Sequence, residues 1–233
     1  MTNMHLDIYT IVLILGISHL MQVLVFFHQY RVNKTYHGIG WWLMWSAAEF
    51  VGFSAILARA IPDLLHPAII VQNSAIVSGT IFIYLGVRRF FEKDLEIKWL
   101  AFIFLGYLLF LNIFLFIWDN ILVRSVVTNL FLAGIAYLTA YTLFKYKKEG
   151  TRGTAIFNSV IFIVHGTVFL SRTILIATGT PVTAMFTPSF FNFLPYFDAL
   201  IVSLLWTFGF IIMVNQRLST ELRVSKDHFE TIF

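Results

Sequence analysis

The sequence predicts an all-α integral membrane protein with seven transmembrane helices. Of its 233 residues, 59% are hydrophobic and only 12% are charged, so the chain has more apolar surface than a water-soluble domain covers. The apolar residues form segments of about 20 residues, the length that a helix needs to cross about 30 Å of hydrocarbon. We expect these helices near residues 7–30, 38–60, 67–88, 98–118, 121–145, 153–178 and 192–215.

The positively charged residues indicate the orientation of these helices. Most of them lie in every second connection and in the tail, so by the positive-inside rule this side is cytoplasmic and the N-terminus is outside. The same asymmetry, together with anionic lipid headgroups, explains the basic pI of about 9.4 without a nucleic-acid partner. The residues concerned are Arg31, Lys34, Arg88, Arg89, Lys93, Lys98, Lys145, Lys147, Lys148, Arg152, Arg217, Arg223 and Lys226.

Four tryptophans support the predicted boundaries. Trp41 and Trp42 lie near the start of the second segment, Trp99 near the start of the fourth, and Trp118 at its end. Tryptophan is enriched at membrane–water interfaces, where one end of its ring system is apolar and the other is wet. We therefore expect all four side chains in an aromatic belt.

Polar residues inside the apolar segments mark the candidate binding site. When sequence positions are converted to depth, His19, Glu49 and His165 lie near the middle of the membrane, where an ionisable group is costly and should face the bundle interior. The inner half of the bundle contains almost no charge. This asymmetry predicts a pocket that opens outward or to the outer leaflet and binds a small or lipophilic ligand. Its expected ligand-binding residues, all in the outer half, are Gln72, Asn73, Asn112, Asn129, Arg172 and Asp198.

Each of these residues also has a purely structural interpretation. The amides can bridge neighbouring helices, which contributes about 0.6 kcal/mol on average. Arg59 and Arg124 lie close enough to the outer surface to extend their side chains into it. Arg172 and Asp198 can form a structural ion pair with each other. The sequence does not decide between these roles and ligand recognition.

The mid-membrane cluster leaves several chemistries open. A histidine can hydrogen-bond to Glu49 and lock two helices together. Alternatively, His19 and His165 can bind a metal ion or act as the axial ligands of a haem, or the cluster can sense protons. A retinal Schiff base is excluded, because all seven lysines lie in loops, at segment ends or in the tail. The cofactor therefore stays unknown.

No enzyme motif occurs in the chain. The sequence contains no Walker loop, no HExxH and no nucleophile elbow, and it has no cysteine for disulfides, thiolate metal sites or nucleophilic catalysis. We therefore expect no catalytic residue and no enzymatic activity in this chain.

The last segment continues into a polar tail without a Gly or Pro break. From residue 211 onward a row of mostly apolar residues, with Asn215 and Ser225 as its polar positions, alternates at spacings of four and three, the pattern of a two-stranded coiled coil. This predicts a helix that leaves the membrane and pairs with a second copy in a parallel homodimer. The expected seam residues are Ile211, Asn215, Leu218, Leu222, Ser225, Phe229 and Ile232.

The junction of membrane segment and tail resembles a known arrangement. Residues 204–233, LLWTFGFIIMVNQRLSTELRVSKDHFETIF, are similar to the place where a seven-helix N-terminal sensory region of bacterial histidine kinases and diguanylate cyclases meets a PAS domain. Residues 38–49, GIGWWLMWSAAE, also resemble members of that group. The resemblance implies a sensory domain over 1–215 in the plasma (inner) membrane of a prokaryote and a cytoplasmic linker helix over 216–233. This linker is expected to lead to a PAS domain and to an output such as the histidine kinase of a two-component system or a diguanylate cyclase.

The function that we expect is thus the input module of a bacterial signal-transduction receptor. Two other classes remain open. A small-solute transporter would use buried polar groups as a path through the membrane, although it also needs such groups in the inner half. A haem or metal protein would use His19 and His165 as ligands.

Overall fold

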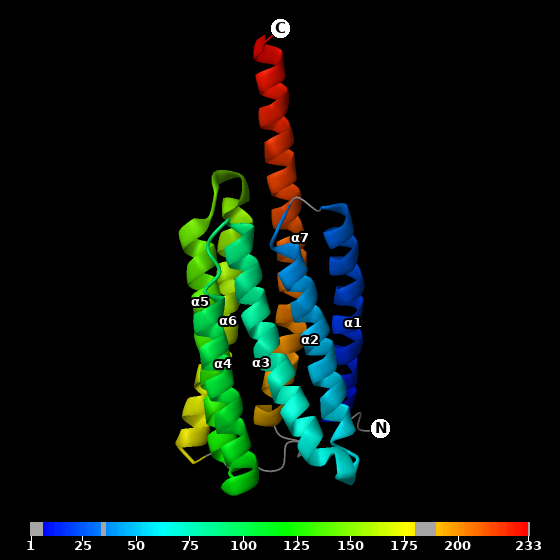
Figure 1. The fold of residues 1–233 in the computed structure, drawn as a ribbon, viewed down its shortest axis with the longest axis vertical. Coiled ribbons are helices and arrows are strands. Elements are labelled where there is room, and N and C mark those ends of the chain that lie inside the picture. Colours follow the sequence, from blue (N-terminus) through cyan, green and yellow to red (C-terminus); the bar gives the residue numbers. More distant parts are fainter. Residues whose placement is uncertain (1–6, 34–35, 180–189, 233) are drawn as a thin grey trace, which may run out of the picture.

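The computed structural model describes residues 7–33, 36–179 and 190–232. Within these residues it contains seven helices that are long and apolar enough to cross a membrane, which confirms the predicted fold class (Figure 1). The membrane side that each end faces stays a prediction. The helices are α1 (Ile8–Val32), α2 (Ile39–Ala58), α3 (Leu65–Phe90), α4 (Ile97–Asn112), α5 (Ile121–Tyr146), α6 (Arg152–Ala177) and α7 (Phe190–Ile232), with short turns η1 (Pro62–Leu64), η2 (Ile113–Ile117) and η3 (Glu149–Thr151).

Local sequence signals explain where two of the helices begin. The Asp7 side chain accepts a hydrogen bond from the Thr10 N–H at 2.6 Å and caps α1. In the same way, Asn120 accepts from the Val123 N–H at 3.1 Å and caps α5. Such caps satisfy backbone donors that have no partner inside the helix.

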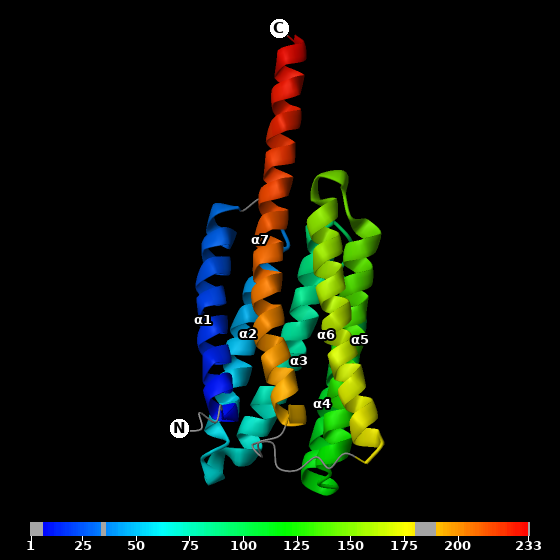
Figure 2. The same ribbon diagram turned by 180° about the vertical axis from the view of Figure 1, so that it is seen from behind.

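The helices form one upright bundle. α2 packs between α1 and α3, α5 packs along α6, and α7 packs between α6 and α1 (Figure 2). α4 lies at the periphery, and its outward residues Phe102, Leu105 and Leu109 are 63 to 70% exposed. Apolar side chains exposed in this way suit a lipid environment, in which all backbone polar groups are satisfied inside the helices.

Aromatic side chains fill the half of the bundle from which α7 projects. Trp42 stacks on Phe210 with ring centroids 4.2 Å apart, and Phe162 stacks on Trp206 at 4.0 Å. Because lipid is as apolar as these rings, close packing rather than the hydrophobic effect holds the helices together here. Stacked pairs of this kind contribute about 0.5 to 1.5 kcal/mol each.

The prediction for Trp42 was wrong. Its side chain is fully buried instead of lying in an aromatic belt, whereas Trp99 and Trp118 are more than 60% exposed. Trp42 faces α3, where Gly86 leaves room for the indole, because a Cβ at Gly86 would overlap with it. The sequence position placed Trp42 correctly near a helix start, but the rotation of α2 about its axis turns the side chain inward.

α7 is the longest helix and continues without a break from the bundle into the projecting tail (Figure 1). It spans 43 residues and contains Pro195 near its start. The boundary expected between residues 215 and 216 therefore falls inside one rod. Leu218, Leu222 and Ser225 are exposed along this rod, while the side chains of Phe229 and Ile232 lie outside the described residues. The homodimer stays a prediction.

Candidate functional site

A cavity of about 190 Å³ lies inside the bundle. Its walls come from α1, α2, α3, α5, α6 and α7, and mostly from the half of the bundle opposite the projecting end of α7. A dry cavity of about 150 Å³ is large enough to hold benzene. The cavity therefore has room for a ligand slightly larger than that.

The cavity collects most of the residues that the sequence singled out. The three mid-membrane residues and four of the six expected ligand-binding residues line it. Asn112 does not, because α4 is peripheral and the Asn112 amide donates to the Leu108 carbonyl at 2.8 Å. Asp198 does not line it either. The predicted residues on the wall are His19, Glu49, Gln72, Asn73, Asn129, His165 and Arg172.

Asp198 pairs with His165, not with Arg172. Its Oδ2 lies 2.5 Å from His165 Nδ1, and both residues are buried at 8% exposure. The structural ion pair between Arg172 and Asp198, one of the two interpretations that the sequence left open, is therefore not formed. On α6, Arg172 lies seven residues beyond His165, which is about 10 Å along the helix axis. That offset places Arg172 at a different level, beside α5.

Arg172 instead donates a hydrogen bond from Nη1 to Asn129 Oδ1 at 3.1 Å. Asn129 is 2% exposed, and its Nδ2 has no hydrogen-bond partner among the residues that the structure describes. Within the same part of the chain, no Asp or Glu side chain forms an ion pair with Arg172. A cation and a free amide donor therefore lie side by side on the cavity wall.

Two further arginines, Arg59 and Arg124, line the cavity. Arg59 donates from Nη1 to Gln72 Oε1 at 3.0 Å. Arg124 donates from Nη1 to Asp119 Oδ1 and to the Phe114 carbonyl, both at 2.6 Å. Their position near helix ends is therefore compatible with contact to the cavity as well as to the outer surface.

The inner part of the cavity is aromatic. The His19 ring stacks on Phe53 with centroids 5.3 Å apart and meets Trp45 edge-on at 5.6 Å. No hydrogen bond joins Glu49 to His19 or His165 among the described residues, so the histidine–glutamate bond that the sequence left open is not formed there. The sequence reasoning missed this aromatic wall, because Phe and Trp are common throughout the chain and only helix rotation shows which ones face inward.

The described residues contain no group of three His, Cys, Asp or Glu side chains that could hold a metal ion. His19 and His165 both line the cavity, but each has its own surroundings. His165 is bonded to Asp198, and Gln22, one turn from His19, donates to Ser203 at 3.4 Å. The role of either histidine as a haem or metal ligand stays a prediction.

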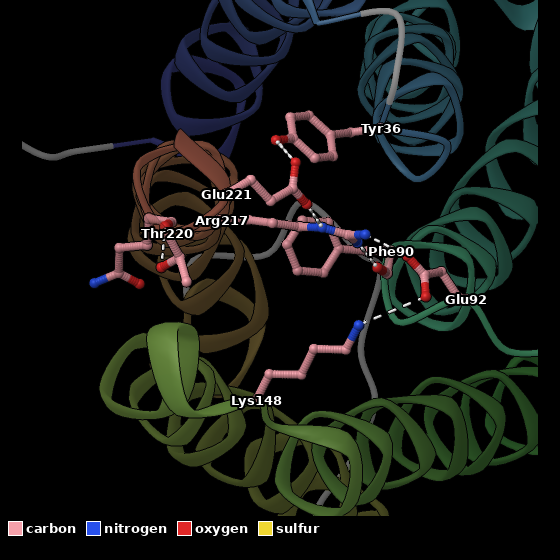
Figure 3. A network of polar contacts seen from close by, with 8 residues as sticks. Tyr36, Phe90, Glu92, Lys148, Arg217, Thr220 and Glu221 are labelled. Carbon is pink, nitrogen blue, oxygen red and sulfur yellow. Dashed lines mark hydrogen bonds and ion pairs between the residues drawn. The ribbon is translucent and has the colours of Figure 1, made fainter. Parts of the chain in front are cut away.

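A second polar group lies where α7 leaves the bundle (Figure 3). Arg217 donates to the Phe90 carbonyl at 2.7 Å, to Glu92, and to Glu221 Oε1 at 2.9 Å. The Tyr36 hydroxyl donates to Glu221 Oε2 at 2.8 Å, and Lys148 lies 3.5 Å from Glu92. These contacts attach the start of the projecting rod to two separate parts of the bundle, the α1–α2 connection and the end of α3, and Lys148 joins the group through Glu92. We call this group the clasp: Tyr36, Phe90, Glu92, Lys148, Arg217 and Glu221.

Hydrogen bonds and neighbouring charges shift the pKa values of two clasp residues. The hydrogen bond and the charge of Arg217, together with Lys148, hold the pKa of Glu92 below its ordinary value. Burial and the neighbouring Glu221 raise the pKa of Tyr36 to about 12, so its hydroxyl remains a donor at neutral pH. Glu92 has φ of 57°, a left-handed conformation that favours glycine. Its side-chain contacts explain why a glutamate serves at this position.

The chain matches no protein-family model, no curated protein and no solved structure. The geometry combines a small internal cavity, which has cationic and aromatic walls, with a long helix, α7, that lines this cavity and projects beyond the bundle. α7 contributes Asn192, Tyr196 and Trp206 to the cavity wall and Arg217 to the clasp. One helix thus contributes both to the cavity wall and to the projecting rod.

Proposed function

We propose that this chain is the sensory input module of a bacterial signalling receptor, which binds a small molecule in the cavity and transmits the event along α7. One observation carries the proposal: α7 both lines the cavity and extends as an unbroken helix beyond the bundle. The resemblance of residues 204–233 to the joint between seven-helix sensory regions and PAS domains supports the same function. The cavity then opens outward, and the rod leads to a cytoplasmic output domain.

The mechanism is a shift between two positions of α7. A ligand shifts such an equilibrium only by the difference in its affinity for the two states. Trp206 and Tyr196 give the ligand direct contact with α7, and the clasp sets the resting position of the rod. Because a helix is stiff along its axis, a small movement or rotation at the cavity reaches the tail.

The aromatic core counts against a transporter. Phe26, Trp42, Phe162 and Phe210 are at most 1% exposed and fill the bundle on the side of the cavity from which the rod projects. A permeation path needs polar groups there as well. Uptake of small solutes into liposomes that contain the purified protein would support the transporter instead.

A chimera tests the sensory function. Residues 1–233 fused to a reporter histidine kinase should give an output that changes with cell extracts, lipids or redox conditions. Ser203→Phe fills the cavity from α7 and should abolish this response, because Ser203 lines the wall and is 3% exposed. The control is Leu204→Phe, which introduces the same side chain at a neighbouring residue that is 40% exposed. A chimera that stays inert under all conditions contradicts the proposal.

A further inference from the structure

We propose that the corner of the cavity formed by Arg172 and Asn129 binds the carboxylate of a small organic anion, and that the apolar body of this anion lies deeper, between aromatic rings. The inference names the ligand class of the proposed sensory site and rests on that function for its biological meaning. The binding itself can be tested separately.

Arg172 supplies the charge. Its side chain is half-buried in a membrane-spanning helix, where an uncompensated guanidinium is costly and marks a functional site. Its hydrogen-bond partner is the neutral oxygen of Asn129, and no carboxylate pairs with it within the described residues. An anionic ligand would provide the missing counter-charge.

Asn129 supplies a second donor. Arginine has donors only, so the bond from Arg172 fixes which end of the Asn129 amide is the oxygen. The Nδ2 group is therefore a donor, and it is buried without a partner in the described part of the chain. Buried polar groups are nearly always hydrogen-bonded, and each exception needs an explanation. Two adjacent donors, one of them charged, match the two oxygens of a carboxylate.

The rest of the cavity limits the size and polarity of the ligand. Trp45, Phe53, Phe169 and Trp206 form an apolar lining at its inner part. Glu49 lies on the same wall at the inner part and offers a second carboxylate no cation to pair with. The volume of about 190 Å³ exceeds only slightly the space that benzene needs. We therefore expect a monocarboxylate with a ring or short chain, oriented with its charge toward Arg172.

The test uses the full chain, purified in detergent, with benzoate as the probe. Benzamide has the same shape without the charge, benzylamine has the opposite charge, and inorganic phosphate tests for a simple anion site. We expect benzoate to raise the thermal unfolding temperature saturably and to bind at least about tenfold more tightly than benzamide by titration calorimetry. Benzylamine and phosphate should have no saturable effect.

Variants assign the effect to the corner. Arg172→Gln should weaken benzoate binding at least about tenfold and leave benzamide unchanged. Arg152→Gln removes the same charge at an exposed position outside the cavity and should behave like the wild type. If Arg172→Gln does not fold, the comparison of benzoate with benzamide on the wild-type protein still tests whether the site selects an anion. Arg172→Lys then serves as the second variant, because it keeps the charge.

Three results would overturn the assignment: equal affinity for acid and amide, benzoate binding that survives Arg172→Gln, or no binding of benzoate or of hexanoate, a flexible probe of similar size. Saturable binding of phosphate alone would also overturn it in favour of an inorganic anion. Failure of the anion site can be distinguished from failure of the sensory function in the chimera experiment. Anion binding with a silent chimera keeps the site and rejects the sensory function, whereas a chimera that responds to neutral compounds alone keeps the function and rejects the anion.

Discussion

His165 on α6 and Asp198 on α7 form a buried pair, with 2.5 Å between Nδ1 and Oδ2. The imidazole also meets Trp206 edge-on, with ring centroids 4.8 Å apart, and Phe169 at 4.9 Å. Both aromatic residues line the cavity. The pair therefore fixes the position of α7 relative to α6 at the level where a ligand would touch both helices.

Removing the carboxylate of this pair should destabilise the bundle. Asp198→Ala leaves the His165 Nδ1 buried without its partner, and the expected loss is about 1 to 3 kcal/mol of unfolding free energy. Asp198→Asn keeps an acceptor and should lose less. Asp63→Ala removes an exposed carboxylate and serves as the control. Thermal unfolding in detergent, followed by tryptophan fluorescence, measures these effects; an Asp198→Ala protein as stable as the wild type would contradict the structural role.

Glu92 should make the clasp sensitive to acid. Because Arg217 and Lys148 lower its pKa in the folded protein, its contacts add stability above the ordinary glutamate pKa, and this stability is lost as pH falls through the lowered value. Glu92→Gln should therefore lower the unfolding temperature at pH 7, and the difference from wild type should shrink below about pH 4. Glu149→Gln removes an exposed carboxylate outside the clasp and should show no such pH-dependent difference. A constant difference across pH would mean that the charge of Glu92 is not involved.

Gly209 should be needed for the close approach of α6 and α7. A Cβ at this position would lie 2.5 Å from Asn158 Nδ2 and 2.6 Å from its Cγ, too close for normal contact. Gly209→Ala should therefore cost about 1 to 3 kcal/mol, the usual effect of overpacking. Gly134→Ala on α5 meets nothing within 4 Å and should be neutral or stabilising by up to about 1 kcal/mol. Equal unfolding temperatures for the two variants would mean that α7 adjusts freely.

The projecting part of α7 should pair with a second copy in parallel. Leu222 lies on the expected seam, and Val224 lies two residues further on another face of the helix; both are 62% exposed. In a chain without native cysteine, Leu222→Cys should form an intermolecular disulfide in membranes, and Val224→Cys should do so poorly. Because the tail has only about two and a half heptads, its pairing depends on the membrane part as well. Equal crosslinking at both positions would contradict a specific seam.

Most of the fold could be predicted from hydropathy alone. Long apolar segments must form helices in lipid because no other local structure satisfies every backbone polar group, and the described helices follow the expected segments closely. The same cost explains why Glu49, His165 and Asn129 could be placed in the interior. An ionisable or amide group in hydrocarbon has to face the bundle, wherever its neighbours lie.

Which side chains meet was decided only by the tertiary structure. Asp198 binds His165 instead of Arg172, Trp42 is buried instead of facing the interface, and Arg59 donates to Gln72 at the cavity wall. These outcomes depend on the rotation of each helix about its axis and on its shift along its neighbour. One helical turn is only about 5.4 Å, so a shift of one turn exchanges partners while the hydropathy of every segment stays the same.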